Sequence, residues 1–439
     1  MNSHSIEYLA PEAANTRNRA WRKYPAEQIK EAKRQLELGG VVEPPLIDSE
    51  NRVVCGGAIV QAAKELKLTS IPVLRVNNMT PEELRLYAIS AHKLADMGGY
   101  DDLLLAEELR ELEDLLGEDK LLHLAMAEGE LSVLLGLTGP VPGEDEELLD
   151  QSEALTVITS PGDLWQVAGH RYLCGTALER CCYEMLMGGE TAQFGLTDSP
   201  FNLSMKTISG DPSREEFAFA SGEMTPNEFA RFLTTAMRLM KEFSEPGSLH
   251  AYFMSYHFLL ELLRAGTIVF GRPKAMCTWV KSQAGQGGLF RSQTEQIVYF
   301  RNGDMPHRDN VKLGKYKRNR STAWHYDGMT TASAERDETL KFHATPKNVM
   351  MLKDAILDVT TRGGIVLDPF AGIGSTMVAA HSAERRAYCI EIEPKFVDVA
   401  IRRMFRTYGI DAIRASDGAS FRELDEAANG QSADHVGEV

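Results

Sequence analysis

The sequence predicts an α/β protein, built on a mostly parallel sheet with covering helices and preceded by a smaller α+β domain. Three stretches carry this prediction. Residues 366–376 run from apolar β-forming residues into two glycines and then a Ser-Thr pair that suits a helix start. Residues 387–393 give a second apolar run that ends in acids, and residues 194–198 give a third that ends at an aspartate. Alternation of such strands with helices is typical of βαβ units.

The glycine-containing turn predicts a ligand site. Gly372 and Gly374 allow a ligand to touch the backbone. Glu391 ends the next strand, where the acid of a βαβ nucleotide site bonds the ribose hydroxyls. Met377 stands where the dinucleotide fingerprint has its third glycine, which argues against a pyrophosphate. We therefore expect a nucleoside without phosphates, such as S-adenosylmethionine, and a nicotinamide-dependent oxidoreductase is the less favoured alternative.

Composition narrows the class of protein. The chain of 439 residues suggests two or three domains, and its net charge of −16 means that a nucleic-acid partner needs a local basic patch. Six scattered cysteines show no metal-ligand spacing, so we expect free thiols, no metal and a cytoplasmic location. No apolar run approaches the roughly 20 residues that span a bilayer, so we expect no membrane partner.

The first part of the chain alternates short strands and helices. Proline in the first turn suits the helix start at Thr80, and a glycine pair ends the first helix. The expected elements are a helix over 25–38, strands at 45–48 and 52–55, a helix after Gly56–Gly57, a strand at 71–76 and helices from 80 to about 137.

The N-terminal segment, over about residues 15–125, resembles the ParB/Sulfiredoxin-like domain. The resemblance lies in the strand pair at 45–55, in Ile71–Pro72–Val73 and in Ala91–His92–Lys93–Leu94. The family usually has G-H-G-R or G-E-R-R after its second strand, where the arginine grips phosphate. Here Gly56–Gly57–Ala58–Ile59 has no arginine. This departure favours a docking or DNA-positioning module, and whether the domain binds a nucleotide is left open.

The segment Asp198–Ser199–Pro200–Phe201 resembles the D-P-P-Y motif of amino-group DNA methyltransferases. An exocyclic base amine is a poor nucleophile because conjugation flattens it. A carboxylate from Asp198 and the carbonyl of Ser199 would accept its N–H groups and steer its lone pair toward a methyl sulfonium. Pro200 would fix the turn, and Phe201 would stack on the flipped base.

The order of motifs, with the catalytic strand before a basic region and the cofactor strand, resembles the beta group of these enzymes over residues 160–424. This implies a Rossmann-like S-adenosylmethionine-dependent methyltransferase sheet with circularly permuted motif order. Asp198 favours adenine, because that position is more often serine in the enzymes that methylate the cytosine amine. Methylation of the cytosine ring carbon is set aside because no cysteine follows a proline.

Two departures from the family leave a second class open. Ser199 replaces the first proline of the motif, and His343–Ala344–Thr345–Pro346–Lys347–Asn348 replaces the family's H-P-T-x-K-P. They motivate the alternative of a catalytically silent, DNA-binding methyltransferase-like protein. The resemblance implies that Thr345 and Lys347 line the methionine end of the cofactor. The full set of predicted cofactor residues is Asp368, Phe370, Gly372, Gly374, Glu391, Thr345 and Lys347.

Basic residues gather in residues 301–325, where the family has its target-recognition segment. We expect this stretch to contact double-stranded DNA through its phosphates. The predicted contacts are Arg308, Lys312, Lys315, Lys317, Arg318 and Arg320.

The predicted organisation has four parts. They are a ParB-like domain with a helical extension at 1–137, an acidic linker at 138–155, the methyltransferase domain at 156–424 and a polar tail at 425–439. The polar segment 203–223 is interpreted either as a lid over the base or as disorder. Whether the protein forms a homodimer, which DNA site it recognises and whether a restriction enzyme accompanies it are left open.

Overall fold

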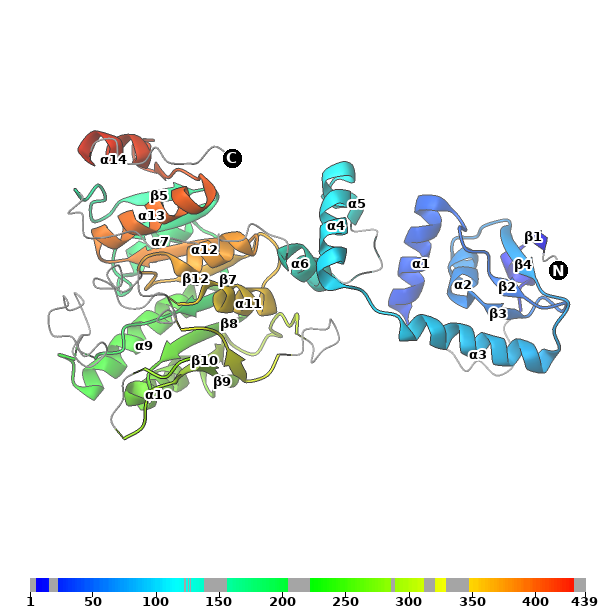
Figure 1. Cartoon of the computed structure of the whole chain (residues 1–439), viewed down its shortest axis with the longest axis horizontal. Coiled ribbons are helices and arrows are strands. Elements are labelled where there is room, and N and C mark those ends of the chain that lie inside the picture. Colours follow the sequence, from blue (N-terminus) through cyan, green and yellow to red (C-terminus); the bar gives the residue numbers. More distant parts are fainter. Residues whose placement is uncertain are drawn as a thin grey trace. The chain divides into compact units, whose positions relative to one another are not determined.

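The computed structural model describes residues 5–15, 23–121, 124, 126, 128–137, 156–203, 222–285, 289–311, 320–328 and 347–429. The chain divides into two compact units, residues 1–128 and 129–439, which are described separately (Figure 1). Among the helices of the described residues, none has the length and apolar character needed to cross a membrane.

The N-terminal unit is a small α+β domain. Its four-stranded sheet has the order β1-β4-β2-β3, and buried side chains such as Ile29, Ile47 and Val73 join it to two helices. The strands are β1 (Ser5–Leu9), β2 (Leu46–Ile47), β3 (Val53–Cys55) and β4 (Ile71–Arg75). The helices include α1 (Ala26–Gly39), α2 (Gly57–Glu65), α3 (Pro81–Met97), α4 (Asp102–Leu116) and α5 (Glu118–Leu121).

The glycine pair before α2 serves close packing. Gly56 has a φ of +78°, and a Cβ added there would lie 2.9 Å from the backbone of Pro45. A Cβ on Gly57 would lie 2.5 Å from the hydroxyl of Tyr24. Glycine at this turn is therefore required by contacts within the domain, at the place where the ParB-like family has a motif with an arginine.

The second unit contains a ten-stranded sheet of order β11-β9-β10-β8-β7-β12-β13-β6-β5-β14. Its centre is parallel, from β8 through β7, β12 and β13 to β6, whereas β10 pairs antiparallel with both β8 and β9. The strands are β5 (Leu164–Val167), β6 (His170–Cys174), β7 (Ala192–Thr197), β8 (Ser244–Met254), β9 (Ala275–Val280), β10 (Thr294–Arg301), β11 (Ala323–His325), β12 (Ile365–Asp368), β13 (Arg386–Glu391) and β14 (Ile413–Arg414).

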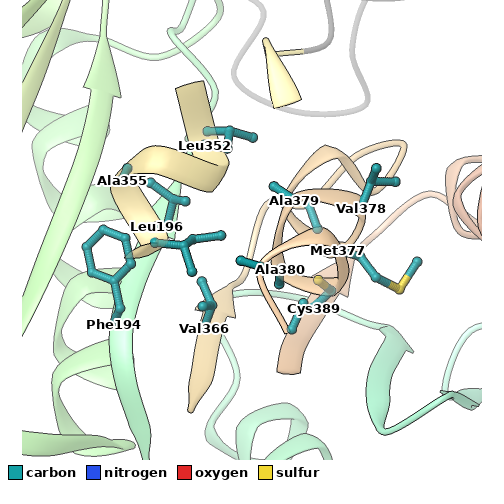
Figure 2. Close-up of a cluster of buried hydrophobic side chains, with 14 of the residues drawn as sticks. Phe194, Leu196, Leu352, Ala355, Val366, Met377, Val378, Ala379, Ala380 and Cys389 are labelled. Atoms are coloured by element: carbon teal, nitrogen blue, oxygen red, sulfur yellow. The ribbon is translucent and has the colours of Figure 1, made fainter. Parts of the chain in front are cut away.

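Helices cover both faces of this sheet. Because successive side chains of a strand point to opposite faces, the strands contribute to two hydrophobic cores, one on each face. On one face, Val366 of β12 and Cys389 of β13 pack with α11 and α12, as Figure 2 shows. On the other face, Leu367 and Ile390 pack with α7, α9 and α10. The helices are α7 (Arg180–Met187), α9 (Pro226–Glu242), α10 (Leu259–Phe270), α11 (Val349–Val359), α12 (Ser375–Ser382) and α13 (Pro394–Tyr408). The predicted α/β class is confirmed.

The order of strands creates a switch point at the centre of the sheet. From β7 the chain passes through α9 to β8 on one side, and from β12 it passes through α12 to β13 on the other. Because β7 and β12 are parallel neighbours, their carboxyl ends lie together. In open α/β sheets, ligands bind in the crevice that forms at this place.

Two boundaries differ from the sequence-based organisation. Helix α6 (Glu128–Leu137), predicted as part of the N-terminal extension, falls in the second unit. Its Ser132 bonds Arg385, and its Gly136 approaches Leu357 so closely that an added Cβ would lie 2.5 Å away. At the other end, α14 (Phe421–Asn429) extends five residues into the predicted tail, and the Asn429 side chain bonds the backbone of Thr156. The linker at 138–155 lies outside the described residues.

Arg385 is the buried cation that ties α6 to the sheet. Its guanidinium, with the residue only 2% exposed, donates to the Ser132 hydroxyl at 2.6 Å, the Thr360 carbonyl at 3.1 Å and the Ala383 carbonyl at 2.5 Å. Removal of the guanidinium would deprive these buried acceptors of a donor, although the Thr360 carbonyl also accepts from Asn310. A buried group that is left unpaired costs about 1–3 kcal/mol.

We therefore expect Arg385→Leu to lower the free energy of unfolding of the second unit by about 2–4 kcal/mol. The matched control is Arg386→Leu, since the Arg386 side chain is 37% exposed and pairs with Glu190 at the surface, where an ion pair is worth about 1 kcal/mol or less. Urea unfolding followed by tryptophan fluorescence measures both. Equal losses for the two variants would contradict the structural role of Arg385.

Candidate active site

The glycine turn follows β12 and has the backbone that its sequence predicts. Gly372 and Gly374 have φ values of +54° and +79°. An added Cβ on Gly374 would lie 2.8 Å from the Cβ of Ala400 in α13, so this glycine is needed for helix packing. An added Cβ on Gly372 would meet no atom within 4 Å. Gly372 therefore leaves open space beside the backbone, as a ligand site requires.

The turn is held by its neighbouring strands. Tyr172 of β6 donates its hydroxyl to the Gly372 carbonyl at 2.6 Å. Glu391, at the end of β13, accepts the Gly372 N–H at 2.9 Å with one oxygen and the Glu393 N–H at 2.9 Å with the other. Burial raises the pKa of Glu391 to about 7, against the lowering effect of these backbone N–H groups. Glu391, the residue predicted to bind the ribose, thus also holds the turn in place.

Asp368 stabilises the start of the turn through hydrogen bonds. This buried carboxylate ends β12 and accepts the Thr376 hydroxyl at 2.6 Å and the Phe370 N–H at 3.2 Å. Burial raises its pKa to about 6, with Asp198 adding in the same direction. Asp368 therefore joins the two ends of the turn, and its hydrogen bonds set the position of Phe370.

The segment Asp198–Phe201 follows β7 directly. Ser199 is buried, whereas the Asp198 side chain keeps 34% of its surface exposed. Asn202, with a φ of +52°, accepts the N–H groups of Gly222 and Met224 at 3.1 and 3.2 Å. These bonds bring the two ends of segment 204–221 together. Residues 204–221, which make up most of the segment 203–223 interpreted either as a lid or as disorder, lie outside the described residues.

These elements surround one cavity of about 1000 Å³. It extends from the end of β7 across the turn after β12 to the end of β13, so Asp198 and the glycine turn open onto the same cavity. All described residues of the predicted catalytic and cofactor sets line it except Gly374. They are Asp198, Ser199, Pro200, Phe201, Asp368, Phe370, Gly372, Glu391 and Lys347. Thr345 lies outside the described residues.

Lys347 lies between two carboxylates in the wall of the cavity. Its ammonium lies 3.1 Å from Oδ1 of Asp198 and 2.6 Å from Oε2 of Glu295. Lys281 lies 2.5 Å from the other oxygen of Glu295. Lys347 was predicted to line the methionine end of the cofactor; it lines the cavity, but its contacts in the structure are these two carboxylates.

Asp198 and Glu295 share Lys347, but their pKa values are shifted in opposite directions. Burial raises the pKa of Asp198 to about 6, and Glu295 adds to this effect while Lys347 opposes it. Burial would also raise the pKa of Glu295, but Lys347 and Lys281 together outweigh it and lower that pKa to about 2. Glu295 is therefore the permanent anion of the group, and Asp198 is the carboxylate that can change its charge near neutral pH.

The predicted DNA contacts fall in two groups. Arg308 pairs with Glu245 at 2.6 Å, and Arg320 pairs with Asp358 at 3.0 Å and Asp354 at 3.3 Å. Neither of these arginines lines the cavity. The remaining four residues of the set, Lys312, Lys315, Lys317 and Arg318, lie outside the described residues.

Several residues of the site were not assigned a role from the sequence. Tyr172 and Asn202 fix the two motif loops, and Lys281 and Glu295 surround Lys347. The sequence does contain a feature that could have identified Lys281 and Glu295, because each is a charged residue at one end of a mostly apolar strand. Their partnership depends on the antiparallel register that sets Glu295 opposite Trp279, and spacing along the chain does not reveal it.

A ligand cavity at the switch point of an α/β sheet, with a glycine turn and an acid at adjacent strand ends, defines the class of Rossmann-like domains that bind a nucleoside-containing cofactor. Comparison with known proteins identifies a narrower family within this class. Residues 192–402 match the family N6_N4_Mtase, described as DNA methylase. This match confirms the resemblance of this part of the chain to amino-group DNA methyltransferases, and with it the predicted cofactor, S-adenosylmethionine.

Individual proteins are similar over shorter stretches. The chain is 29% identical over 138 residues to the Type II methyltransferase M.Cfr9I of Citrobacter freundii, a match that covers 31% of this chain and 43% of that protein. The ParB-like nuclease domain-containing protein YnaK of Escherichia coli (strain K12) is 30% identical over 78 residues, which are 18% of this chain and 84% of YnaK. The N-terminal resemblance to ParB-like domains is thereby confirmed.

The similarity to solved structures is low. The PvuII DNA methyltransferase, described as cytosine-N4-specific, is 13% identical with a TM-score of 0.43, and the match covers 61% of this chain and 95% of that one.

We expect Glu391→Ala to weaken S-adenosylmethionine binding at least tenfold, because the carboxylate both holds the Gly372 N–H and faces the position expected for the ribose. Isothermal titration calorimetry measures this. The matched control is Glu190→Ala, which removes a half-exposed carboxylate at the surface and should leave the affinity unchanged. Equal affinity of Glu391→Ala and the wild type would show that the cofactor does not bind at this turn.

Proposed function

We propose that this protein transfers a methyl group from S-adenosylmethionine to the exocyclic amine of adenine in double-stranded DNA. The observation that carries the proposal is the position of Asp198. Its carboxylate lines the cavity from the end of β7, next to the glycine turn of the adjacent strand β12. An acceptor for the amine and a site for the cofactor thus share one space.

The residues of the cavity suit the cofactor. Gly372 leaves its backbone open, Glu391 offers its carboxylate at the next strand end, and Phe370 adds an aromatic face that packs against Phe232. We infer that Glu391 binds the ribose hydroxyls and that Phe370 contacts the adenosine. When bound, S-adenosylmethionine supplies an electrophilic methyl group on a sulfonium.

Asp198 performs the protein's part of the reaction. Its carboxylate accepts one amine N–H, and the carbonyl of Ser199 accepts the other, so the nitrogen lone pair is held toward the methyl carbon. As the nitrogen–carbon bond forms, the carbon–sulfur bond breaks and its electron pair stays on sulfur. The nitrogen then loses a proton, for which ionised Asp198 is the nearest base in the proposed pose.

The choice of adenine rests on residue type. Serine is the usual first residue of this motif in enzymes that act on the cytosine amine, and this chain has Asp198. Cytosine remains the alternative substrate because both amines need the same pair of acceptors. The catalytically silent alternative is less favoured, since Ser199 still provides its backbone carbonyl beside the cavity.

The basic stretch is proposed as the DNA contact, and the ParB-like unit as a module that positions DNA. Arg320 is engaged with Asp354, Asp358 and the Tyr326 hydroxyl, so we infer that it anchors the base of the segment. Lys315 and Lys317 are the residues we propose to contact phosphates.

Asp198→Asn should lower the rate of methyl transfer in a single-turnover assay with tritiated cofactor and duplex DNA by at least about 10²-fold, since it removes the charged acceptor. Binding of S-adenosylmethionine should change little. Glu184→Gln, on the exposed side of α7, is the matched control and should react like the wild type. An undiminished rate for Asp198→Asn refutes the assigned role. Sequencing the product for modified bases distinguishes adenine from cytosine.

We expect Lys315→Ala and Lys317→Ala to weaken DNA binding and to reduce the dependence of log K on log salt by about one unit per phosphate contact removed. Their unfolding transitions should match the wild type. Arg320→Ala should show the reverse pattern, with a lower free energy of unfolding because the carboxylates of Asp354 and Asp358 lose their contact with its positive charge. Fluorescence anisotropy at several salt concentrations, together with urea unfolding, separates the two roles.

A further inference from the structure

Four charged side chains alternate in sign along one wall of the cavity. Lys281 contacts one oxygen of Glu295 at 2.5 Å, Lys347 contacts the other at 2.6 Å, and Lys347 continues to Asp198 at 3.1 Å. Lys347 and Glu295 are only 7% and 12% exposed at their side chains. The formal charges sum to zero, which makes burial of the group tolerable.

Aromatic rings surround the ammonium of Lys347. It lies 5.2 Å from the ring centres of both Phe201 and Phe253 and 5.5 Å from that of Trp279. These distances are within the range of cation–π attraction. Together with the two carboxylates, the rings fix the ammonium at one place, and Phe201 belongs to the catalytic motif itself.

The contact between Lys347 and Asp198 leaves the carboxylate available. Oδ1 of Asp198 is buried and 3.1 Å from the ammonium, yet among the described residues it accepts no well-aligned hydrogen bond. The exposed surface of the side chain therefore belongs to its other atoms, which face the cavity. The lysine supplies positive charge to Asp198 without occupying the side on which a substrate N–H would bind.

We propose that Lys347, held by Glu295 and Lys281, is a positioning residue that keeps Asp198 ionised and aimed into the cavity for methyl transfer. This rests on the proposed function of Asp198. In this proposal, Lys347 acts on the carboxylate of Asp198 rather than on the cofactor. Glu295 contributes to the same function by holding Lys347.

The charges around Asp198 predict opposite effects for the two partners. Lys347 and Lys281 favour its ionised form, whereas Glu295 from β10 and Asp368 from the end of β12 oppose it. Without Lys347, the carboxylate of Asp198 would keep two acidic neighbours and lose its nearest cation. Its pKa, about 6 in the intact protein, should then rise by about one unit or more, and removal of the Glu295 charge should lower it.

The test compares single-turnover methyl transfer from pH 5.5 to 9 for the wild type, Lys347→Met and Glu295→Gln. Ionised Asp198 is the active form, so the wild-type rate should fall as the pH drops through about 6. For Lys347→Met, a shift of one unit lowers the rate at pH 6 about fivefold, and the difference should close above pH 8. Glu295→Gln should move the profile to lower pH, and Lys347→Arg should restore the wild-type profile.

A purely structural role of Lys347 would lower the rate by the same factor at every pH, and that result would overturn the inference. Lys274→Met, which removes an exposed lysine outside the cavity lining, is the matched control and should behave like the wild type. If Lys347→Met does not fold, as judged by circular dichroism, the direction of the Glu295→Gln shift decides the question.

A second readout separates this inference from the proposed function. The Asp198 carboxyl can be titrated by carbon-13 NMR in protein labelled at aspartate, with Asp198→Asn identifying the signal. A higher pKa in Lys347→Met supports the inference even if the wild type methylates no DNA. An unchanged pKa overturns it even if the wild type is active.

Discussion

The parallel pairing of β7 with β12 is the constraint on which the site depends. These strands are about 170 residues apart in the sequence, but their register sets Phe194 beside Val366 and Gly195 beside Leu367. Asp198 and the turn at Gly372 follow from the same pairing, because each comes immediately after its strand. Gly195 belongs to this arrangement, since an added Cβ would lie 2.4 Å from the imidazole of His250 on β8.

The sequence predicts those parts of the molecule that depend on local patterns. Apolar runs identify the central strands, the turn after β12 requires glycine at a positive φ, and the acid at the end of β13 follows from the βαβ pattern. Parallel strands of one sheet have their carboxyl ends at the same edge. Local patterns were therefore enough to predict that Asp198, Gly372 and Glu391 lie around a single cavity.

The partners of the charged residues depend instead on tertiary contacts that no local pattern encodes. Arg320 looks like a DNA contact in a basic stretch, yet it is engaged with carboxylates of α11. Lys347 sits in a motif that implies the cofactor, yet it contacts Asp198 and Glu295. Helix α6 follows the N-terminal helices in the chain, but the contacts of Ser132 with Arg385 join it to the second unit.

The position of Lys347 also bears on the departure at Ser199. A proline at this place would restrict the backbone that presents the carbonyl proposed to accept the substrate amine, and serine restricts it less. The loop is nevertheless held on both sides, because Lys347 contacts Asp198 before it and lies over the ring of Phe201 after it, while Asn202 ties the next turn to Met224. Side-chain contacts can thus supply the order that the ring of proline supplies elsewhere. The serine is then compatible with an active motif as long as the group of Lys347, Glu295 and Lys281 stays intact.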